Sequence, residues 1–259
     1  PDVAAVHADA ARVLAQAQEH GHGRHPGAQA GDGAPRGGRG APDVAVDGQQ
    51  SGQRGGRARG GDDDGGAVGI GLLTNYDGIY LGAPEFEPLL KALDDHHATV
   101  VIHPTSPKGA EHLTCGRPSP VIEYLFETTR AVTDLLLAGA VTAYPHIQWV
   151  VLHNGAAIPS VIDRVSMFAS MILHADADPM EQLRSMVFEI GSSTPFPRTA
   201  QSIATLAGSE QLVLGTDTPY APTQIVAQNI SRILAGELDQ IVDIDRISST
   251  AARLFPTLA

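Results

Sequence analysis

Three short apolar runs of the chain each end on a side chain that can bind a metal or move a proton. These side chains are His103, His153 and Asp217. Imidazole nitrogen and carboxylate oxygen are ordinary ligands of a divalent metal, and a catalytic metal site keeps one position open for water or substrate. An imidazole with a pKa near neutrality can also deliver a proton. The three residues therefore indicate metal-assisted or acid–base chemistry.

The segments that lead to these residues are typical of buried parallel strands. Each is rich in β-branched residues or Leu, and helix-like stretches flank it. With two further runs of the same kind, we predict strands near 67–73, 98–103, 147–153, 186–190 and 211–216. Apolar residues at helical spacing predict helices at 86–95, 122–140, 158–173, 223–234 and 245–255. Strands alternating with helices predict parallel βαβ units with right-handed crossovers.

The number of strands leaves two α/β architectures open. Five parallel strands form either a small open sheet or part of an eight-stranded β/α barrel of the TIM type that is incomplete at its N-terminus. In a barrel, the active site lies at the C-terminal ends of the strands. His103, His153 and Asp217 would then share one mouth.

The composition changes sharply near residue 67. Residues 1–66 contain 16 Gly, five Val and one Leu, and no Ile, Met, Phe, Tyr or Trp. Such a stretch cannot bury enough apolar surface to offset the chain entropy lost on ordering. We therefore expect 1–66 to be disordered or irregular and 67–259 to form the catalytic domain. The first segment is either a genuine disordered extension or a GC-rich gene read in a shifted frame, and resequencing the coding DNA distinguishes the two.

The charge and the cysteine content exclude several classes of protein. A net charge of -12 argues against a nucleic-acid-binding face, which needs clustered Lys and Arg, so small molecules are the expected ligands. Cys115 is the single cysteine, which excludes an intrachain disulfide and fits a reducing compartment. The apolar runs are too short to span a bilayer, and no apolar leader begins the sequence. We expect a cytoplasmic protein.

Six segments, in order along the chain, resemble one known family. They are TNYDGIYLG at 74–82, VIHPT at 101–105, FETTR at 126–130, LHNG at 152–155, GTDTPY at 215–220 and ARLF at 252–255. Together they are similar to the amidohydrolase-related metal-dependent decarboxylases, which include aminocarboxymuconate semialdehyde decarboxylase and decarboxylases of salicylate-type acids. The resemblance covers about residues 67–259. It implies a distorted β/α barrel with a divalent metal at its C-terminal mouth, usually zinc and sometimes manganese or magnesium.

The resemblance also implies a role for each candidate residue. His103 and Asp217 look like metal ligands, and Asp217 also belongs to the catalytic set. His153 is similar to the histidine that shuttles a proton beside the metal. Arg164 occupies the place of an arginine that in some members reaches a neighbouring subunit's site and holds a substrate carboxylate, which implies a homodimer. The expected reaction is non-oxidative loss of carbon dioxide from a small aromatic or unsaturated carboxylic acid.

The sequence departs from the family in two places. The family's first strand ends in His-x-His and supplies two metal ligands, and no apolar strand predicted here ends that way. His20 and His22 have this spacing, but they follow polar residues and Ala rather than an apolar run. Asn154 also stands beside His153 where glycine is usual. Two protein ligands are too few for a tight site. An inactive truncated fragment is therefore one alternative. A hydrolase or hydratase using the same barrel is another, since a metal-bound hydroxide aided by the same His would attack a carbonyl or lactone equally well.

Overall fold

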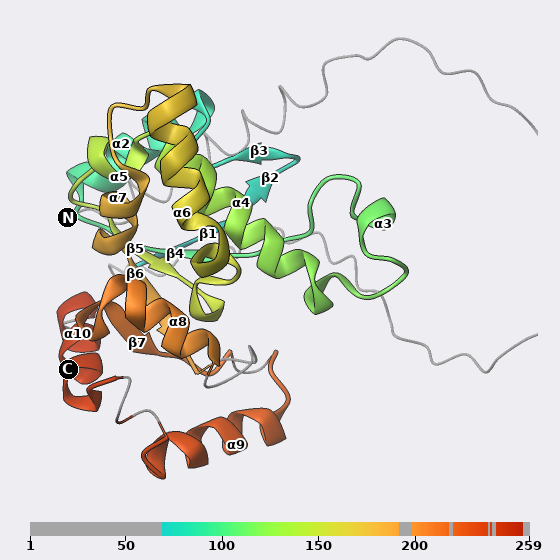
Figure 1. Cartoon of the computed structure of the whole chain (residues 1–259), viewed down its shortest axis with the longest axis vertical. Helices are drawn as coiled ribbons and strands as arrows, with labels where there is room; N and C mark the ends of the chain where they lie inside the picture. Colours follow the sequence, from blue (N-terminus) through green and yellow to red (C-terminus); the bar gives the residue numbers. More distant parts are fainter. Residues whose placement is uncertain (1–68, 192–197, 218–219, 238, 240–241, 256–259) are drawn as a thin grey trace, which may run out of the picture.

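The centre of the fold is a five-stranded parallel sheet (Figure 1). The computed structural model describes residues 69–191, 198–217, 220–237, 239 and 242–255. In spatial order the strands are β1 (Ile70–Leu73), β4 (Thr99–His103), β5 (Gln148–Val151), β6 (Val187–Ile190) and β7 (Leu212–Leu214). Each strand pairs in parallel with the next. All the carboxyl ends therefore meet at one edge of the sheet.

The two faces of the sheet differ in character. One face packs against helices and contributes large buried side chains, namely Ile102, Trp149, Val151 and Phe188. The other face is built from smaller side chains, namely Val101, Val150, Val187 and Val213, against which Leu254 packs. Because side chains alternate along a strand, His103 and Glu189 continue the valine face, two residues beyond Val101 and Val187. The polar strand ends thus share one side of the sheet.

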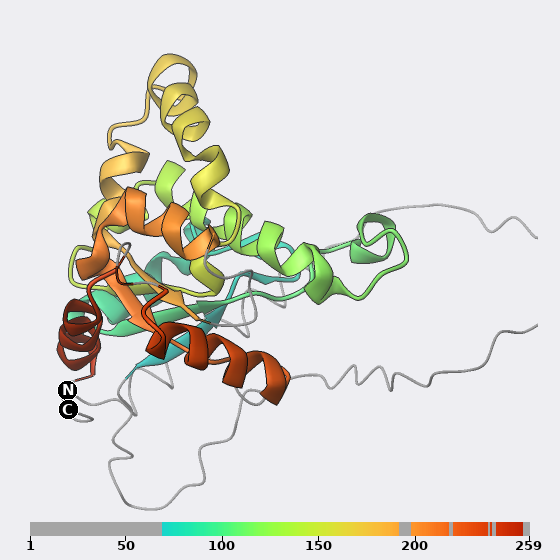
Figure 2. The ribbon, with the colours of Figure 1, turned by 60° about the horizontal axis from the view of Figure 1, so that its bottom comes forward.

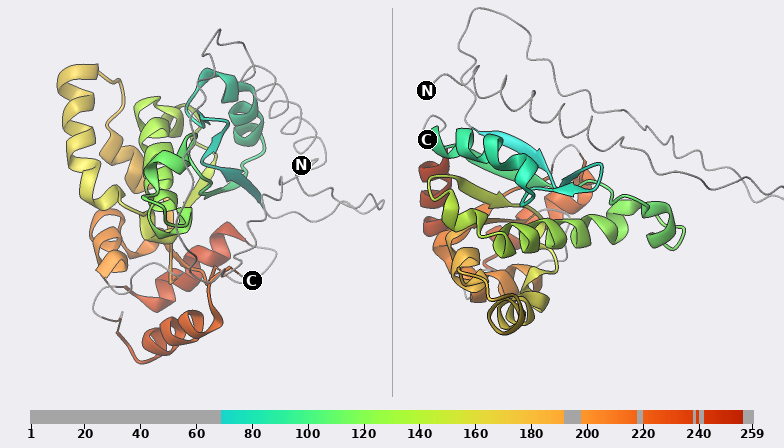
Figure 3. Two further views of the ribbon diagram at one scale, coloured as in Figure 1. Left: turned by 90° about the vertical axis from the view of Figure 1, so that its right-hand side faces the viewer. Right: turned by 90° about the horizontal axis from the view of Figure 1, so that it is seen from above.

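Helices cover the large-residue face of the sheet. Several helices contribute buried side chains to its core, among them α2 (Glu87–Asp95), α4 (Glu123–Leu137), α5 (Ala140–Ala143), α6 (Ile158–Phe168), α7 (Pro179–Ser185) and α8 (Arg198–Ala207). Helix α9 (Thr223–Leu234) follows β7, and α10 (Ile244–Leu254) packs against β7. Helix α3 (Ala110–Leu113) lies on an arm that projects from the sheet (Figures 2 and 3). A π-helix, η4 (Ala169–Leu173), continues α6.

A short antiparallel hairpin follows β1. It consists of β2 (Asn75–Tyr76) and β3 (Ile79–Tyr80). Its two turn residues, Asp77 and Gly78, have left-handed backbone conformations with φ of 51° and 87°. We did not predict this hairpin, although an Asp-Gly pair between short apolar stretches is a common hairpin signal.

The start of helix α4 departs from its apolar pattern, whereas Val132, Leu135 and Leu136 farther along are buried as that pattern predicts. Ile122 and Phe126 belong to the apolar spacing that predicts this helix, yet they are 43% and 42% exposed. Glu123 and Glu127 are instead buried, with exposures of 5% and 0%. The burial of Glu127 is tolerated because hydrogen-bond donors surround its carboxylate.

The predicted order of elements is confirmed by the structure. All five predicted strands form, and the helices predicted between and after them form with small shifts of their ends. No helix within the described ranges is long and apolar enough to cross a membrane. The predicted irregular segment 1–66, with His20 and His22, lies outside the described residues.

Candidate active site

The three predicted site residues lie together at the carboxyl edge of the sheet. His103 is the last residue of β4, His153 opens the short helix η3 (His153–Gly155) after β5, and Asp217 follows β7 by three residues. Nε2 of His153 is 3.8 Å from Oδ2 of Asp217. The rings of His103 and His153 meet edge to face, with centroids 6.1 Å apart. Three separate βα units thus contribute to one site.

His103 is oriented by its neighbouring peptide. Its Nδ1 lies 2.8 Å from the carbonyl oxygen of Pro104. A carbonyl oxygen can only accept, so Nδ1 is protonated and Nε2 of the neutral ring keeps its lone pair. Metal-binding histidines usually have this arrangement, in which one nitrogen donates to a carbonyl and the other binds the ion. The orientation of His103 is therefore suited to binding through Nε2.

A buried carboxylate on β6 fixes the backbone of His153. The His153 N–H donates to Oε2 of Glu189 at 2.9 Å, and Glu189 is 6% exposed. Gly215 makes room for this carboxylate, because a Cβ added there would lie 2.5 Å from Cγ of Glu189. The sequence does not predict this contact, because its donor is a backbone N–H.

The turn after β5 has an unusual backbone. His153, Asn154 and Ala156 have φ of 58°, 54° and 54°, and Gly155 between them has φ of 70°. A left-handed conformation costs a non-glycine residue about 1–2 kcal/mol, and such clusters are common at functional sites. Asn tolerates this region better than most residues. Asn154 is fully buried.

The electrostatic surroundings of His153 favour its neutral form. Burial lowers the pKa of His153 below its usual value of 6.5. The Asp217 carboxylate opposes this shift, while His103 adds to it. The result is a lowered pKa, so His153 is neutral at pH 7 and can accept a proton. Its Nδ1 is buried and has no hydrogen-bond partner among the described residues.

The donors at this edge fit part of a divalent-metal site. Nε2 of His103 and the carboxylate of Asp217 have the right chemistry, and the Asp217 side chain is 18% exposed. Within the described part of the chain, no three or more His, Cys, Asp or Glu side chains are placed together to hold an ion. Two such donors are fewer than the three protein ligands that a catalytic zinc site usually has.

Comparison with known proteins identifies the family. The profile of the family described as Amidohydrolase matches residues 2–256. The chain belongs to this family. The chain is 29% identical to 6-methylsalicylic acid decarboxylase of Penicillium expansum, over 74% of this chain and 61% of that protein. It thus spans about three fifths of the length of the curated relatives that it matches first.

Solved structures show the same fold. A crystal structure of an amidohydrolase II protein superposes with a TM-score of 0.65 and 27% identity, over 75% of this chain and 63% of that one. Dihydroxybenzoic acid decarboxylase of Polaromonas sp. JS666, solved with bound manganese and 2-nitroresorcinol, superposes with a TM-score of 0.58 at 15% identity, over 70% and 56%. The expected β/α barrel, with five parallel strands in its described part, is confirmed.

Arg164 of this amidohydrolase lies apart from the three strand-end residues. It is exposed on α6, where its guanidinium stacks 4.7 Å above the centre of the Phe168 ring. None of the contacts described here joins it to His103, His153 or Asp217. Met171, in the following π-helix, is 67% exposed. Arg164 therefore lies on an exposed surface with a strong apolar component.

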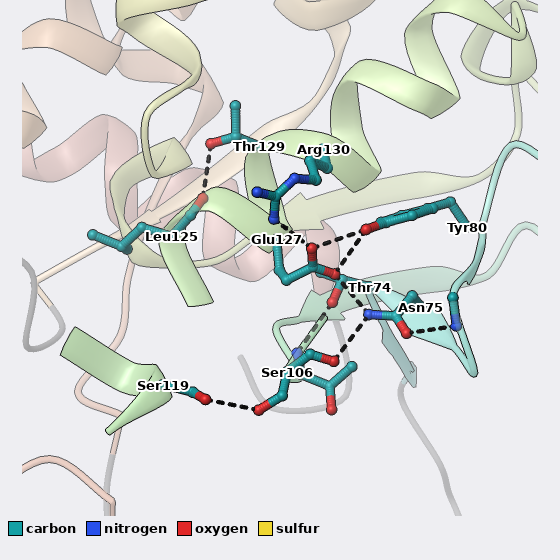
Figure 4. Close-up of polar contacts among 11 residues, drawn as sticks. Thr74, Asn75, Tyr80, Ser106, Ser119, Leu125, Glu127, Thr129 and Arg130 are labelled. Carbon is teal, nitrogen blue, oxygen red and sulfur yellow. Dashed lines mark hydrogen bonds and ion pairs between the residues drawn. The ribbon is translucent and has the colours of Figure 1, made fainter. Parts of the chain in front are cut away.

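A second polar cluster lies near the same edge of the amidohydrolase sheet (Figure 4). Glu127 accepts hydrogen bonds from Nδ2 of Asn75 at 2.6 Å and from the hydroxyl of Tyr80 at 2.9 Å. Nη1 of Arg130 donates to Glu127 at 2.6 Å. These contacts join the β2–β3 hairpin to α4. We did not predict the cluster, whose one sequence signal is a Glu-x-x-Arg pair within an otherwise buried stretch of helix.

Proposed function

We propose that this amidohydrolase is a metal-dependent decarboxylase that removes carbon dioxide, without oxidation, from a small aromatic or unsaturated carboxylic acid. The convergence of His103, His153 and Asp217 at one edge of a parallel sheet is the observation that supports this most. The activity named for the similar fungal protein, decarboxylation of 6-methylsalicylic acid, is of this class.

Two of these residues are proposed as metal ligands. His103, through Nε2, and Asp217, through its carboxylate, would hold a divalent ion. We propose zinc, with manganese and magnesium as alternatives, because imidazole and carboxylate donors suit all three to different degrees. A bound divalent ion draws electron density from the substrate's oxygen atoms and so stabilises charge that develops during the reaction.

His153 is proposed as the proton carrier. Loss of carbon dioxide leaves an electron pair on a carbon atom, which must then receive a proton. His153 is neutral near pH 7 because burial lowers its pKa, so it can take up a proton and pass it to that carbon. Asp217, 3.8 Å away, stabilises the imidazolium while it exists. Glu189 holds the backbone from which the ring projects.

We also propose that the protein is a cytoplasmic homodimer. Arg164 would then bind the substrate carboxylate in the partner subunit's site, since a guanidinium binds a carboxylate through two hydrogen bonds. In support, Phe168, Met171 and Ile172 are 38%, 67% and 62% exposed around it, and contiguous apolar surface usually marks an interface. The exposed free thiol of Cys115 fits a reducing compartment.

Hydrolysis on the same site is the second candidate function, because the family match is to amidohydrolases. The reaction product distinguishes decarboxylation from hydrolysis. The protein, loaded with zinc or manganese, is incubated with 6-methylsalicylate and other hydroxybenzoates. One carbon dioxide released per acid consumed, without oxygen or an organic cofactor, supports the proposal. Cleavage of lactones or amides with uptake of water, and no carbon dioxide from any acid, contradicts it. If the protein retains no more than a trace of either metal, both catalytic proposals fail and the chain is an inactive fragment.

A further inference from the structure

A pocket of about 500 Å³ opens between the β2–β3 hairpin, the segment after β4, and helices α3 and α4. Two cations, Lys108 and Arg130, and one carboxylate, Asp77, line it together with Ile79, Tyr80 and Leu113. None of the three strand-end residues lines it. Its volume lies within the range of roughly 300–1,000 Å³ that is usual for small-molecule sites. The pocket therefore has the size and the mixed lining of a ligand site.

The hairpin wall of this pocket is held in place by close packing. A Cβ added to Gly78 would lie 3.3 Å from Cδ of Lys108, so the stem of Lys108 lies directly against the turn. Nζ of Lys108 is 3.3 Å from Oδ1 of Asp77, and these side chains are 66% and 39% exposed. Such an exposed ion pair is weak. The ammonium group can therefore turn toward an anion in the pocket.

Arg130 is anchored from behind by a buried carboxylate. Glu127 is fully buried and accepts Nη1 of Arg130 at 2.6 Å. The same carboxylate also accepts hydrogen bonds from Asn75 and Tyr80, so three donors share one negative charge. A guanidinium carries donors on all three of its nitrogens. Nε and Nη2 of Arg130 contact no acceptor among the described residues. The guanidinium of Arg130 thus lines the pocket, held by Glu127 through one nitrogen and with donors left for a ligand.

We propose that this pocket binds a small aromatic carboxylate, with Arg130 pairing with the carboxylate and Ile79, Tyr80 and Leu113 contacting the ring. The planar fork of a guanidinium matches a carboxylate through two parallel hydrogen bonds. Because Glu127 already holds Arg130, little side-chain freedom is lost on binding. Lys108 adds a second positive charge at the rim. An inorganic anion would leave the apolar walls without contacts.

The assignment does not rest on the proposed decarboxylase reaction. Lys108 lies five residues beyond His103, so the pocket and the catalytic residues both lie at the carboxyl side of the sheet, but they share no residue. The carboxylate bound here belongs to a second molecule, because the substrate carboxylate is assigned above to Arg164 of the partner subunit's site. In the active enzyme, benzoate bound here therefore changes kcat, and this effect is lost in Arg130→Lys.

Titration of the full chain with benzoate, without added metal, tests the pocket by calorimetry or by ligand-observed NMR. Benzyl alcohol is the matched probe without a carboxylate. We expect benzoate to bind at least fivefold more tightly than benzyl alcohol. Arg130→Lys keeps a positive charge beside Glu127 but loses the fork, and we expect about a tenfold loss of benzoate affinity. Arg184→Lys, an exposed arginine on α7, is the control and leaves benzoate binding unchanged.

A loss of benzoate affinity smaller than threefold in Arg130→Lys overturns the assignment, as does equal binding of benzoate and benzyl alcohol. If Arg130→Lys lowers the melting temperature, the double variant Glu127→Gln/Arg130→Gln removes the buried charge together with its partner. Benzoate binding retained in that folded double variant also overturns the assignment. Because neither metal nor turnover enters the measurement, its failure is distinguishable from failure of the decarboxylase proposal.

Discussion

Nε2 of His153 and Oδ2 of Asp217 lie 3.8 Å apart, although they come from different βα units. This separation is too long for a good hydrogen bond, yet it is short enough for the charge of one group to affect the titration of the other. The Asp217 carboxylate opposes the lowering of the His153 pKa by burial. Replacing His153 alone tests the transfer of a proton, and replacing Asp217 alone tests the binding of a metal.

We expect His153→Ala and Asp217→Ala to differ in what they lose. His153→Ala removes the proton carrier, and we expect turnover to fall by about 10²–10⁴-fold while bound metal is retained. Asp217→Ala removes a ligand, so both metal and turnover are expected to be lost. Metal content and carbon dioxide release are measured on the same samples. His146→Ala is the control, because His146 lies at the opposite end of β5. Undiminished activity in either site variant refutes the assignment.

The lowered pKa of His153 predicts a pH dependence of stability. Below about pH 6.5, the unfolded chain takes up a proton on this residue that the folded chain resists. The free energy of unfolding is therefore expected to fall as pH decreases from 6.5 toward the folded-state pKa, and this group has no effect above that window. Urea unfolding of metal-free protein at several pH values measures the slope. His153→Ala should flatten it, and an unchanged slope in that variant contradicts the prediction.

Gly215→Ala is expected to destabilise the protein by about 1–3 kcal/mol, because overpacking in a buried site forces neighbouring atoms to move. The added Cβ would lie 2.5 Å from Cγ of Glu189, which accepts the His153 N–H. Turnover should therefore fall together with stability. Gly71→Ala is the matched control, because a Cβ there meets nothing within 4 Å. Equal melting temperatures for the two variants would contradict this account.

Tyr80 is expected to ionise late in an alkaline titration. Burial, followed by its hydrogen bond to Glu127 and the charge of Glu127, raises the pKa of Tyr80 to about 12. The unfolded chain loses this proton near pH 10, so the free energy of unfolding should fall between about pH 10 and 12. Tyrosinate absorbance in the ultraviolet measures the ionisation. Tyr80→Phe should remove the rise in tyrosinate absorbance near pH 12. If the rise persists in that variant, it comes from another tyrosine.

The strands and the strand-end residues were predictable because their signals are local. The β-branched composition of 99–102 by itself predicts a buried strand. Parallel pairing then places His103 beside the ends of neighbouring strands. His103, His153 and Asp217 could therefore be grouped before any contact was known. Their grouping in the structure follows from the parallel topology and not from their separation in the sequence.

The polar contacts that hold the site were not predictable in the same way. Glu127 is buried because Asn75, on a hairpin 52 positions earlier, donates to it. Glu189 binds a backbone N–H, and the burial of Asn154 depends on the turn that follows β5. Each contact depends on tertiary packing, which overrides local apolar patterns. For this reason Ile122, just before α4, and Phe126, on α4, are exposed while Glu127 is buried.

The spatial order of the parallel sheet has a consequence for how the chain is made. Its strands stand in the order in which they are synthesised, from β1 through β4, β5 and β6 to β7. During translation, each new strand can therefore dock on the strand that has just been placed, and none has to be inserted between two strands already paired. Each strand that emerges from the ribosome is the next one to be added to the edge of the sheet. The described part of the sheet can thus grow in one direction, at the pace of translation.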